Sequence, residues 1–422
     1  MLFENLKKIN LSSSKSIQKV PKLSTPNLEA LNLSLCENLL EVHESVGFLD
    51  KLKTWDLTFC KNLQTLPKRM KLKSLKKFHL TGCKSIRKLP ELWAPNLKTL
   101  NLSSCENLVE IHESVGLLNK LKTWDLTKCE KLQTLPRRIK LKFLVEFHLI
   151  GCKSIKKLPK MWAPNLKTLN LSSCENLVEI HESIGLLNKL KTLDFNKCEK
   201  LQTLPRRIKL KSLEEFDLTN FSRLEEFPEI HPEMQCLKRL VLYNCGIREL
   251  PSSIVHLTGL VTLDLQNCQN LGELPNSIYK LQQLDRLSLC TTIQRLTCNS
   301  FDRSFKYGFV KLKELSLCGE NVTELDFMEP KYFPVLNCLV LENTSTVTIP
   351  ESFSRFTSLK EISIINCEKF REIQGLPEIL NCLVVLNCQS CDPQSSSKIL
   401  NQVSLSLSHC CKETILLLSS NT

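Results

Sequence analysis

Two aspartate–histidine pairs have the residue types and the spacing that could carry out acid–base chemistry. Asp56 precedes His79 by 23 residues, and Asp125 precedes His148 by the same number. On neighbouring strands, such a carboxylate could orient an imidazole as a general base. No unique nucleophile accompanies either pair, and the second pair repeats the first within a duplicated stretch of sequence. We therefore interpret the pairs as a polar row, and we expect no catalytic residues and no enzyme.

A cysteine cluster near the end of the chain is the other candidate for chemistry. Cys388 and Cys391 form a C-x-x-C motif, with Cys382 and the run His409–Cys411 nearby. A structural zinc site needs four ligands at consistent spacings, and a second C-x-x-C motif is missing. The sequence also contains no phosphate-binding loop of the form G-x-x-x-x-G-K-[ST]. We therefore expect neither a metal ion nor another cofactor.

All these residues lie in a chain that repeats itself. Residues 96–144 and 165–213 are copies of one 49-residue text with five substitutions, and a more diverged copy begins at Asn27. The 69-residue period contains three units of 22 to 24 residues, each opening with Leu-x-x-(Leu/Trp/Phe)-x-(Leu/Phe). We place 17 unit starts, at Leu6, Leu28, Leu52, Leu75, Leu97, Leu121, Leu144, Leu166, Leu190, Leu213, Leu237, Leu260, Leu284, Leu312, Leu336, Leu359 and Leu380. The pattern L-x-x-L-x-L-x-x-C-x-x-L-x-x-L-P is that of a leucine-rich repeat.

The spacing of the apolar residues predicts the fold. Positions four and six of a unit, such as Trp55 and Leu57, lie on one face of a short strand. One unit cannot bury this face alone, but stacked units share a continuous core. We therefore predict an α/β leucine-rich-repeat solenoid of about 17 repeats, a horseshoe with a concave parallel β-sheet and short 3-10 or loop segments on its convex side. The predicted solenoid spans 1–391, with super-repeats at 28–96, 97–165 and 166–234, and 392–422 is a poorly structured tail.

Cysteine recurs at the ninth position of 12 of the 17 units. These residues are Cys36, Cys60, Cys83, Cys105, Cys129, Cys152, Cys174, Cys198, Cys245, Cys268, Cys367 and Cys388. Many leucine-rich repeats use asparagine here, and cysteine is a small and readily buried replacement. We expect stacked, reduced thiols in the core, which favour the cytosol or the nucleus.

The four tryptophans divide into two pairs. Trp55 and Trp124 replace leucine at the fourth position of their units, so we expect them in the core. Trp93 and Trp162, each followed by Ala-Pro-Asn, come just before a strand. We expect this second pair to pack between units.

The charge is unevenly distributed. Residues 1–212 contain 39 Lys and Arg against 19 Asp and Glu, whereas residues 213–422 contain 18 against 25. Three basic runs recur at the same place in the super-repeat and form a candidate dock for an acidic domain. Their residues are Lys68, Arg69, Lys71, Arg137, Arg138, Lys140, Arg206, Arg207 and Lys209. Because few aromatic residues accompany the runs, we do not expect nucleic acid as the partner.

Several phrases of the sequence point to one family. They are residues 97–111, 129–136 and 247–254, with the opening residues 3–12 and the late residues 375–383. Together these phrases resemble the repeat region of plant TIR-type nucleotide-binding leucine-rich-repeat (TIR-NB-LRR) disease-resistance proteins. The resemblance implies that the sheet face binds a pathogen effector or a guarded host protein, and that the N-terminal units hold the receptor's own nucleotide-binding domain inactive. The sequence contains neither the TIR domain nor the nucleotide-binding domain, so their activities are not implied.

The units from Leu237 onward are less duplicated and offer the diversity that specific recognition needs. The candidate partner-binding residues are Lys238, Arg239, Tyr243, Asn244, Gln266 and Asn267. No stretch approaches the roughly 18 apolar residues needed to cross a bilayer, so we expect no membrane partner. The location expected is the cytoplasm or the nucleus. A stand-alone leucine-rich-repeat adaptor or decoy, or a truncated receptor fragment, is the alternative.

Overall fold

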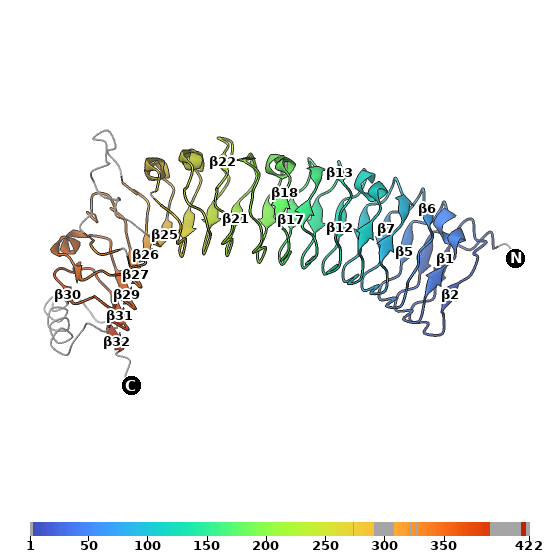
Figure 1. Ribbon diagram of the computed structural model, residues 1–422, viewed down its shortest axis with the longest axis horizontal. Coiled ribbons are helices and arrows are strands. Elements are labelled where there is room, and N and C mark those ends of the chain that lie inside the picture. The colour runs from blue at the N-terminus through green and yellow to red at the C-terminus, as the bar shows by residue number, and fades with distance from the viewer. Residues whose placement is uncertain are drawn as a thin grey trace. The chain divides into compact units, whose positions relative to one another are not determined.

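The computed structural model describes residues 3–272, 274–290, 308–320, 322–325, 328–388 and 415–418. The chain divides into two compact units, Met1–Asp217 and Leu218–Thr422. Each unit is a stack of turns, and every turn contributes one strand to a parallel sheet (Figure 1). We call the solvent side of these main strands the sheet face.

The main strands of the first unit are three residues long and pair in parallel without a shift in register. They are β1 (Lys8–Asn10), β3 (Ala30–Asn32), β5 (Thr54–Asp56), β7 (Lys77–His79), β10 (Thr99–Asn101), β12 (Thr123–Asp125), β14 (Glu146–His148), β17 (Thr168–Asn170), β19 (Thr192–Asp194) and β21 (Glu215–Asp217). Trp55 on β5 lies opposite Leu31 on β3 and Phe78 on β7. All three side chains are buried, so the predicted alternation along the strand is confirmed.

The other side of the first unit carries a second row of short strands and 3-10 helices. The strands are β2 (Lys19–Val20), β4 (Glu41–Val42), β6 (Arg69–Lys71), β8 (Lys88–Leu89), β9 (Glu91–Trp93), β11 (Glu110–Ile111), β13 (Arg138–Lys140), β15 (Lys157–Leu158), β16 (Lys160–Trp162), β18 (Glu179–Ile180) and β20 (Arg207–Ile208). The 3-10 helices are η1 (Glu44–Phe48), η2 (Glu113–Leu117) and η3 (Glu182–Leu186). The predicted 3-10 segments are therefore present, whereas the sequence pattern did not predict the short strands.

The second unit repeats this plan, and all its main strands except the first are longer than three residues. They are β23 (Arg239–Val241), β24 (Thr262–Leu265), β25 (Arg286–Cys290), β26 (Glu314–Cys318), β27 (Cys338–Glu342), β29 (Glu361–Ile365), β31 (Cys382–Leu386) and β32 (Ile415–Leu418). Its second row contains β22 (Glu229–Ile230), β28 (Thr348–Ile349), β30 (Glu372–Ile373), η4 (Ser252–His256), η5 (Asn276–Lys280) and η8 (Glu351–Arg355). A main strand begins two residues after each of the 17 unit starts placed from the sequence. The predicted leucine-rich-repeat solenoid is confirmed.

The ninth-position cysteines form a ladder of hydrogen bonds inside the solenoid. The thiol of Cys60 donates to the carbonyl of Leu33 at 3.0 Å, and that of Cys83 donates to the carbonyl of Leu57 at 3.1 Å. Each thiol thus satisfies a buried main-chain carbonyl of the preceding turn, as buried carbonyls require. Burial raises the pKa of the Cys60 thiol to about 12, so the thiol keeps its proton. All twelve of these cysteines have reduced thiols rather than disulfide bonds, as predicted.

A left-handed backbone residue precedes the ninth position of every repeat in which that residue is described. These residues are Ser13, Leu35, Phe59, Gly82, Ser104, Lys128, Gly151, Ser173, Lys197, Asn220, Asn244, Asn267, Gly319, Asn343, Asn366 and Asn387. Asparagine and glycine tolerate this conformation, whereas a longer side chain costs roughly 1–2 kcal/mol there. The second unit uses asparagine in most of its repeats, and the first unit uses several strained residues.

Replacing Lys128 with asparagine is expected to raise the free energy of unfolding by about 1 kcal/mol. Lys128 is exposed and has a φ of 59°, and its replacement relieves backbone strain without removing a buried contact. Urea unfolding followed by circular dichroism measures the change. The neighbouring exposed Lys131, which lacks a positive φ, provides the control variant Lys131→Asn, which should leave stability unchanged. Equal stability of the two variants would contradict the prediction.

Candidate interaction surface

The aspartate–histidine pairs lie side by side but serve the backbone. Parallel register places Asp56 opposite His79 and Asp125 opposite His148. The Asp56 carboxylate accepts the N–H of Thr58 at 2.9 Å, which closes a turn at the end of the strand. Among the described residues, no hydrogen bond joins either aspartate to its histidine. The geometry therefore supports the interpretation of a polar row.

The same turn explains why asparagine and aspartate recur at the fifth position of the units. The side chain accepts the backbone N–H two residues further on in Asn10, Asn32, Asp56, Asn101, Asp125, Asn170, Asp194 and Asp264. Most of these bonds measure 2.9 Å. On the first unit's sheet face, this row is therefore a repeated structural device. A surface built from copies of one device offers little that is particular to one partner.

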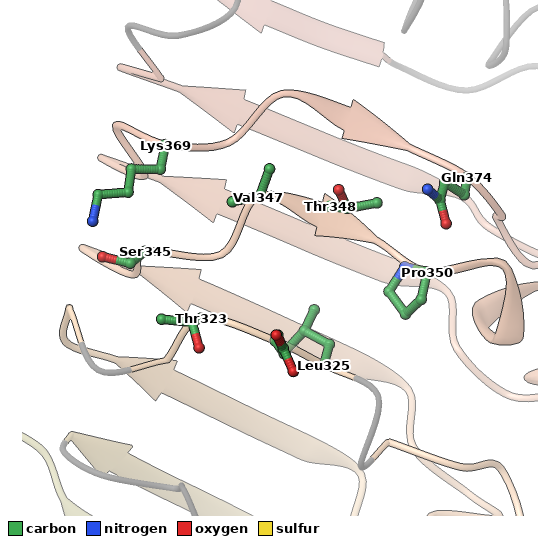
Figure 2. A pocket seen from close by; sticks show the side chains of 9 residues that line it. Thr323, Leu325, Ser345, Val347, Thr348, Pro350, Lys369 and Gln374 are labelled. Carbon is green, nitrogen blue, oxygen red and sulfur yellow. The ribbon is translucent and has the colours of Figure 1, made fainter.

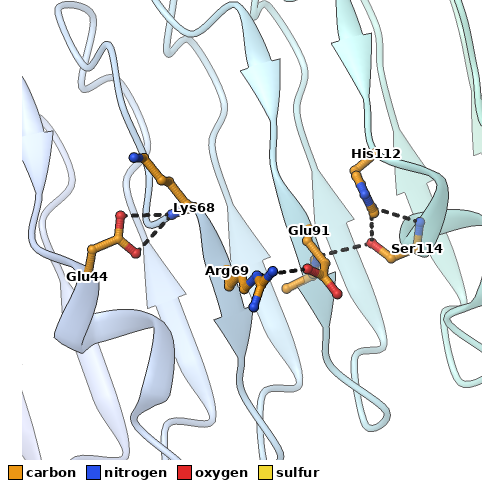
Figure 3. A network of polar contacts seen from close by, with 7 residues as sticks. Glu44, Lys68, Arg69, Glu91, His112 and Ser114 are labelled. Atoms are coloured by element: carbon orange, nitrogen blue, oxygen red, sulfur yellow. Dashed lines mark hydrogen bonds and ion pairs between the residues drawn. The ribbon is translucent and has the colours of Figure 1, made fainter.

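The repeated His-Glu-Ser segment of the super-repeat also supports the backbone. His112 Nδ1 accepts the N–H of Ser114 at 3.2 Å and thereby caps η2 (Figure 3). The Ser114 hydroxyl accepts the N–H of Leu92 on the preceding turn at 3.0 Å. In the preceding copy, the carboxylate of Glu44 accepts the N–H of Lys68 through both of its oxygens, each at 3.0 Å. Each 3-10 helix is thus anchored to the turns on either side of it.

The three predicted basic runs lie at equivalent places in the second row of the first unit. Eight of their nine residues are exposed, and Lys209 is half-buried. Arg69 forms an ion pair with Glu91 at 3.5 Å (Figure 3). The runs are three turns apart, which corresponds to about 14 Å at roughly 4.8 Å for each turn. The structure therefore places them in one row but leaves gaps between them.

The expectation that Trp93 and Trp162 pack between units is wrong. Trp93 is 49% exposed and Trp162 is 53% exposed, because each occupies the last, outward position of a short second-row strand. Their neighbours Leu92 and Met161 take the buried position, as the alternation along a strand requires. These strands are only three residues long, so their alternation could not be recognised from the sequence pattern. Trp55 and Trp124 are fully buried, as predicted.

The candidate contact residues of the second unit fall into two groups. Lys238 and Arg239 are exposed, and Tyr243, two residues after the end of β23, is 41% exposed. Gln266 is half-buried and donates to the hydroxyl of Ser316 at 2.9 Å, across the sheet face. These four residues offer cationic, aromatic and amide groups to a partner.

Asn244 and Asn267 have a structural role. Both lie in left-handed turns, with φ of 54° and 58°. Asn244 donates its amide to Asn220 at 2.9 Å, and Asn267 donates to Asn244 at 3.0 Å. This amide ladder uses much of their hydrogen-bonding capacity.

A shallow hollow of about 510 Å³ lies in the second row of the second unit (Figure 2). It is lined by Thr323, Glu324, Leu325, Ser345, Val347, Thr348, Pro350, Lys369 and Gln374. Its lining mixes hydroxyl, charged and apolar groups. In the part of the chain that the structure describes, no group of three or more His, Cys, Asp or Glu residues could hold a metal ion. Among the same residues, no helix has both the length and the apolar character needed to cross a membrane.

Comparison with known proteins relates this solenoid to plant immunity. The family described as "Disease resistance protein RPS4B-like, leucine-rich repeats" matches residues 209–411. Disease resistance protein RPS6 of Arabidopsis thaliana is 28% identical over 431 residues, which cover 96% of this chain and 33% of that protein. Disease resistance protein RPP4 of the same plant is 30% identical over 462 residues, which cover 92% of this chain and 39% of that protein. TMV resistance protein N of Nicotiana glutinosa is 32% identical over 293 residues, or 66% of this chain and 25% of that protein.

The chain spans less than half of the length of each of these relatives. A leucine-rich-repeat protein of Leptospira interrogans with a solved structure has a TM-score of 0.38 and 17% identity, over 97% of this chain and 96% of that one. That likeness concerns the fold alone. The sequence comparisons confirm the resemblance, and the chain is a leucine-rich-repeat region homologous to those of plant TIR-NB-LRR disease-resistance proteins.

Proposed function

We propose that this chain is the non-catalytic recognition region of an intracellular plant immune receptor. Its sheet face in the second unit binds a pathogen effector or a guarded host protein. The homology to disease-resistance proteins supports this proposal. The reduced thiols of the twelve ninth-position cysteines fit a reducing compartment, the cytoplasm or the nucleus.

The difference between the two sheet faces is the observation that carries the proposal. In the first unit, the third position of the repeat, which begins each main strand, is threonine in five of the ten strands, at Thr54, Thr99, Thr123, Thr168 and Thr192, and is lysine, alanine or glutamate in the other five. The corresponding residues of the second unit are Arg239, Thr262, Arg286, Glu314, Cys338, Glu361 and Cys382. A varied surface can distinguish partners by charge and shape, whereas a repeated one offers the same contact several times.

The basic runs of the first unit are proposed to hold the receptor's own nucleotide-binding domain in its inactive state. Their exposure supports this role, as does the balance of 39 basic against 19 acidic residues in residues 1–212. An acidic surface on that domain would complete the contact. This regulatory role is independent of partner recognition by the second unit.

Charge reversal at Lys238 and Arg239 tests the recognition role. Binding of the full chain to a panel of recombinant effectors and host proteins can be measured by biolayer interferometry. We expect Lys238→Glu/Arg239→Glu to weaken the binding of a specific partner at least tenfold, because two attractive contacts become repulsive. Lys76→Glu/Lys77→Glu is the matched control, since these exposed residues hold the same two positions in a first-unit repeat. Equal affinities of the Lys238→Glu/Arg239→Glu variant and the control variant for that partner would contradict the proposal.

A further inference from the structure

The second row of the first unit presents exposed side chains in a regular order that the basic runs alone do not show. Successive turns present Lys71, Trp93, Leu117, Lys140, Trp162 and Leu186, which we call the Lys–Trp–Leu row. Both lysines are exposed, and Leu117 and Leu186 are 57% and 60% exposed. With the half-exposed tryptophans, the row therefore displays two complete periods of one cation followed by two large apolar groups.

The residues of the row are neighbours in space. Lys71 pairs in register with Trp93, and Lys140 pairs in register with Trp162. The helix η2, which ends at Leu117, lies against both β9 and β13, and η3 lies against β16. The row therefore runs without interruption along the stacking direction of the turns, which follow one another at roughly 4.8 Å.

The two lysines of the row, and the cations beside the row in the second copy, form no ion pair among the described residues. Arg69 pairs with Glu91 in the first copy, but the second copy has Lys160 in place of that glutamate, opposite Arg138. Among the described residues, Lys71, Arg138, Lys140 and Lys160 form no ion pair. Unpaired cations beside exposed tryptophan and leucine form a surface that an acidic and apolar partner would complement.

We propose that the Lys–Trp–Leu row binds an extended acidic protein segment in which acidic and apolar residues alternate on one side. Because Lys71 and Lys140 belong to the basic runs, this proposal rests on the docking role proposed for those runs. Side chains on one side of an extended chain recur about every 6.7 Å. To fit the row, a segment must place a carboxylate at each lysine, and the two lysines are about 14 Å apart. It must also place an apolar side chain above each tryptophan–leucine pair, whose centre lies about 7 Å from the lysine on either side. An extended segment with the pattern acidic-x-apolar-x meets both spacings.

Nucleic acid fits the same row less well. Bases could stack on Trp93 and Trp162, but the aliphatic Leu117 and Leu186 offer no stacking platform. The tryptophans are about 14 Å apart, which is far wider than the distance between successive stacked bases. A protein segment uses the leucines and the tryptophans alike.

Fluorescence anisotropy of labelled peptides with the full chain tests the proposal. The probe is fluorescein-labelled peptide with three repeats of Glu-Ser-Leu-Ser, which places Glu and Leu alternately on one side. A peptide of three Glu-Leu-Ser-Ser repeats has the same composition but places Glu and Leu on opposite sides, and we expect it to bind at least tenfold more weakly. Labelled oligothymidine tests nucleic acid in the same assay.

Two surface variants locate the binding. We expect Trp93→Ser/Trp162→Ser and Arg138→Glu/Lys140→Glu each to weaken binding of the first peptide at least tenfold, since buried aromatic and cationic contacts dominate interfaces. Lys76→Glu/Lys77→Glu on the sheet face is the control for net charge and should change binding less than twofold. Lys238→Glu/Arg239→Glu should also leave binding unchanged, so this proposal and that for the sheet face can fail separately.

Iodide quenching of the wild-type chain gives a readout that needs no variant. Only Trp93 and Trp162 of the four tryptophans are exposed, so the bound peptide should protect a large share of the quenchable fluorescence. Equal binding of both peptides, loss of binding in the sheet-face control, or absence of protection would each overturn the proposal. Tryptophan-dependent binding of oligothymidine without binding of the peptide would assign the row to nucleic acid and would also overturn it.

Discussion

Replacing Trp124 with leucine is expected to lower the free energy of unfolding by about 2–3 kcal/mol. The Trp124 side chain is fully buried and stacks on Phe147, with ring centroids 4.7 Å apart and planes 12° apart. Leucine cannot fill the same volume, so a cavity and a lost aromatic contact remain. The indole N–H has no hydrogen-bond partner among the described residues, so its removal costs no hydrogen bond seen there.

The third copy of the super-repeat suggests how to repair this loss. It has Leu193 where the second copy has Trp124, and Phe195 where the second copy has Leu126. Phe195 is buried and contacts Phe216, with ring centroids 6.5 Å apart. The aromatic ring has moved from the fourth to the sixth position of the unit while the core remains filled.

The double variant Trp124→Leu/Leu126→Phe is therefore expected to recover at least half of the stability that Trp124→Leu loses. Urea unfolding of the full chain, followed by circular dichroism, compares the two variants. Trp162→Leu is the control, because that tryptophan is 53% exposed and its replacement should change stability by no more than about 0.5 kcal/mol. If Trp124→Leu/Leu126→Phe were no more stable than Trp124→Leu, an aromatic ring at position 126 would not compensate for the loss of the ring at position 124.

The repeat register and the ladder of thiols could be predicted from sequence because both depend on a strict local pattern. Leucines at the first, fourth and sixth positions determine which side of each strand is buried, and all 17 strands begin where this pattern places them. The ninth position lies at a fixed distance from that strand, so its burial follows from the same register. Cys129 and Cys152 illustrate this, since each donates to a leucine carbonyl at 3.1 Å.

The second row could not be predicted in the same way, because its strands are only two or three residues long. Such short segments leave little periodicity to detect, and Trp93 was placed between units from its Ala-Pro-Asn neighbour alone. The roles of Asn244 and Asn267 depend on a left-handed backbone, which a single unit does not reveal. Among the candidate contact residues, the sequence therefore pointed to the exposed Lys238, Arg239 and Tyr243. It did not distinguish these three from Asn244 and Asn267, which build the turns.

Replacing Gly116 with alanine is expected to lower the free energy of unfolding by about 2–3 kcal/mol. A Cβ atom at this position would lie 2.4 Å from the carbonyl oxygen of Arg138 and 3.0 Å from Cβ of Pro136. Neither is the flexible end of a side chain, so β13 must move away from η2. Gly47 and Gly185 meet the same backbone at the same place in the other copies, with Cβ-to-oxygen distances of 2.5 Å.

Gly272→Ala is the matched control for this effect, because its Cβ would lie 3.5 Å from the nearest atom, the carbonyl oxygen of Arg248. That distance is an ordinary contact, so the control should keep or slightly raise stability, since alanine has less freedom than glycine in the unfolded chain. Thermal unfolding of both variants separates a steric effect from a general cost of losing glycine. Because β13 carries Lys140, displacement of β13 should also break the spacing of the Lys–Trp–Leu row. Gly116→Ala should therefore weaken binding of the Glu-Ser-Leu-Ser peptide, measured at a temperature where this variant remains folded. Equal stability of Gly116→Ala and Gly272→Ala would show that the close approach of η2 to β13 imposes no steric limit.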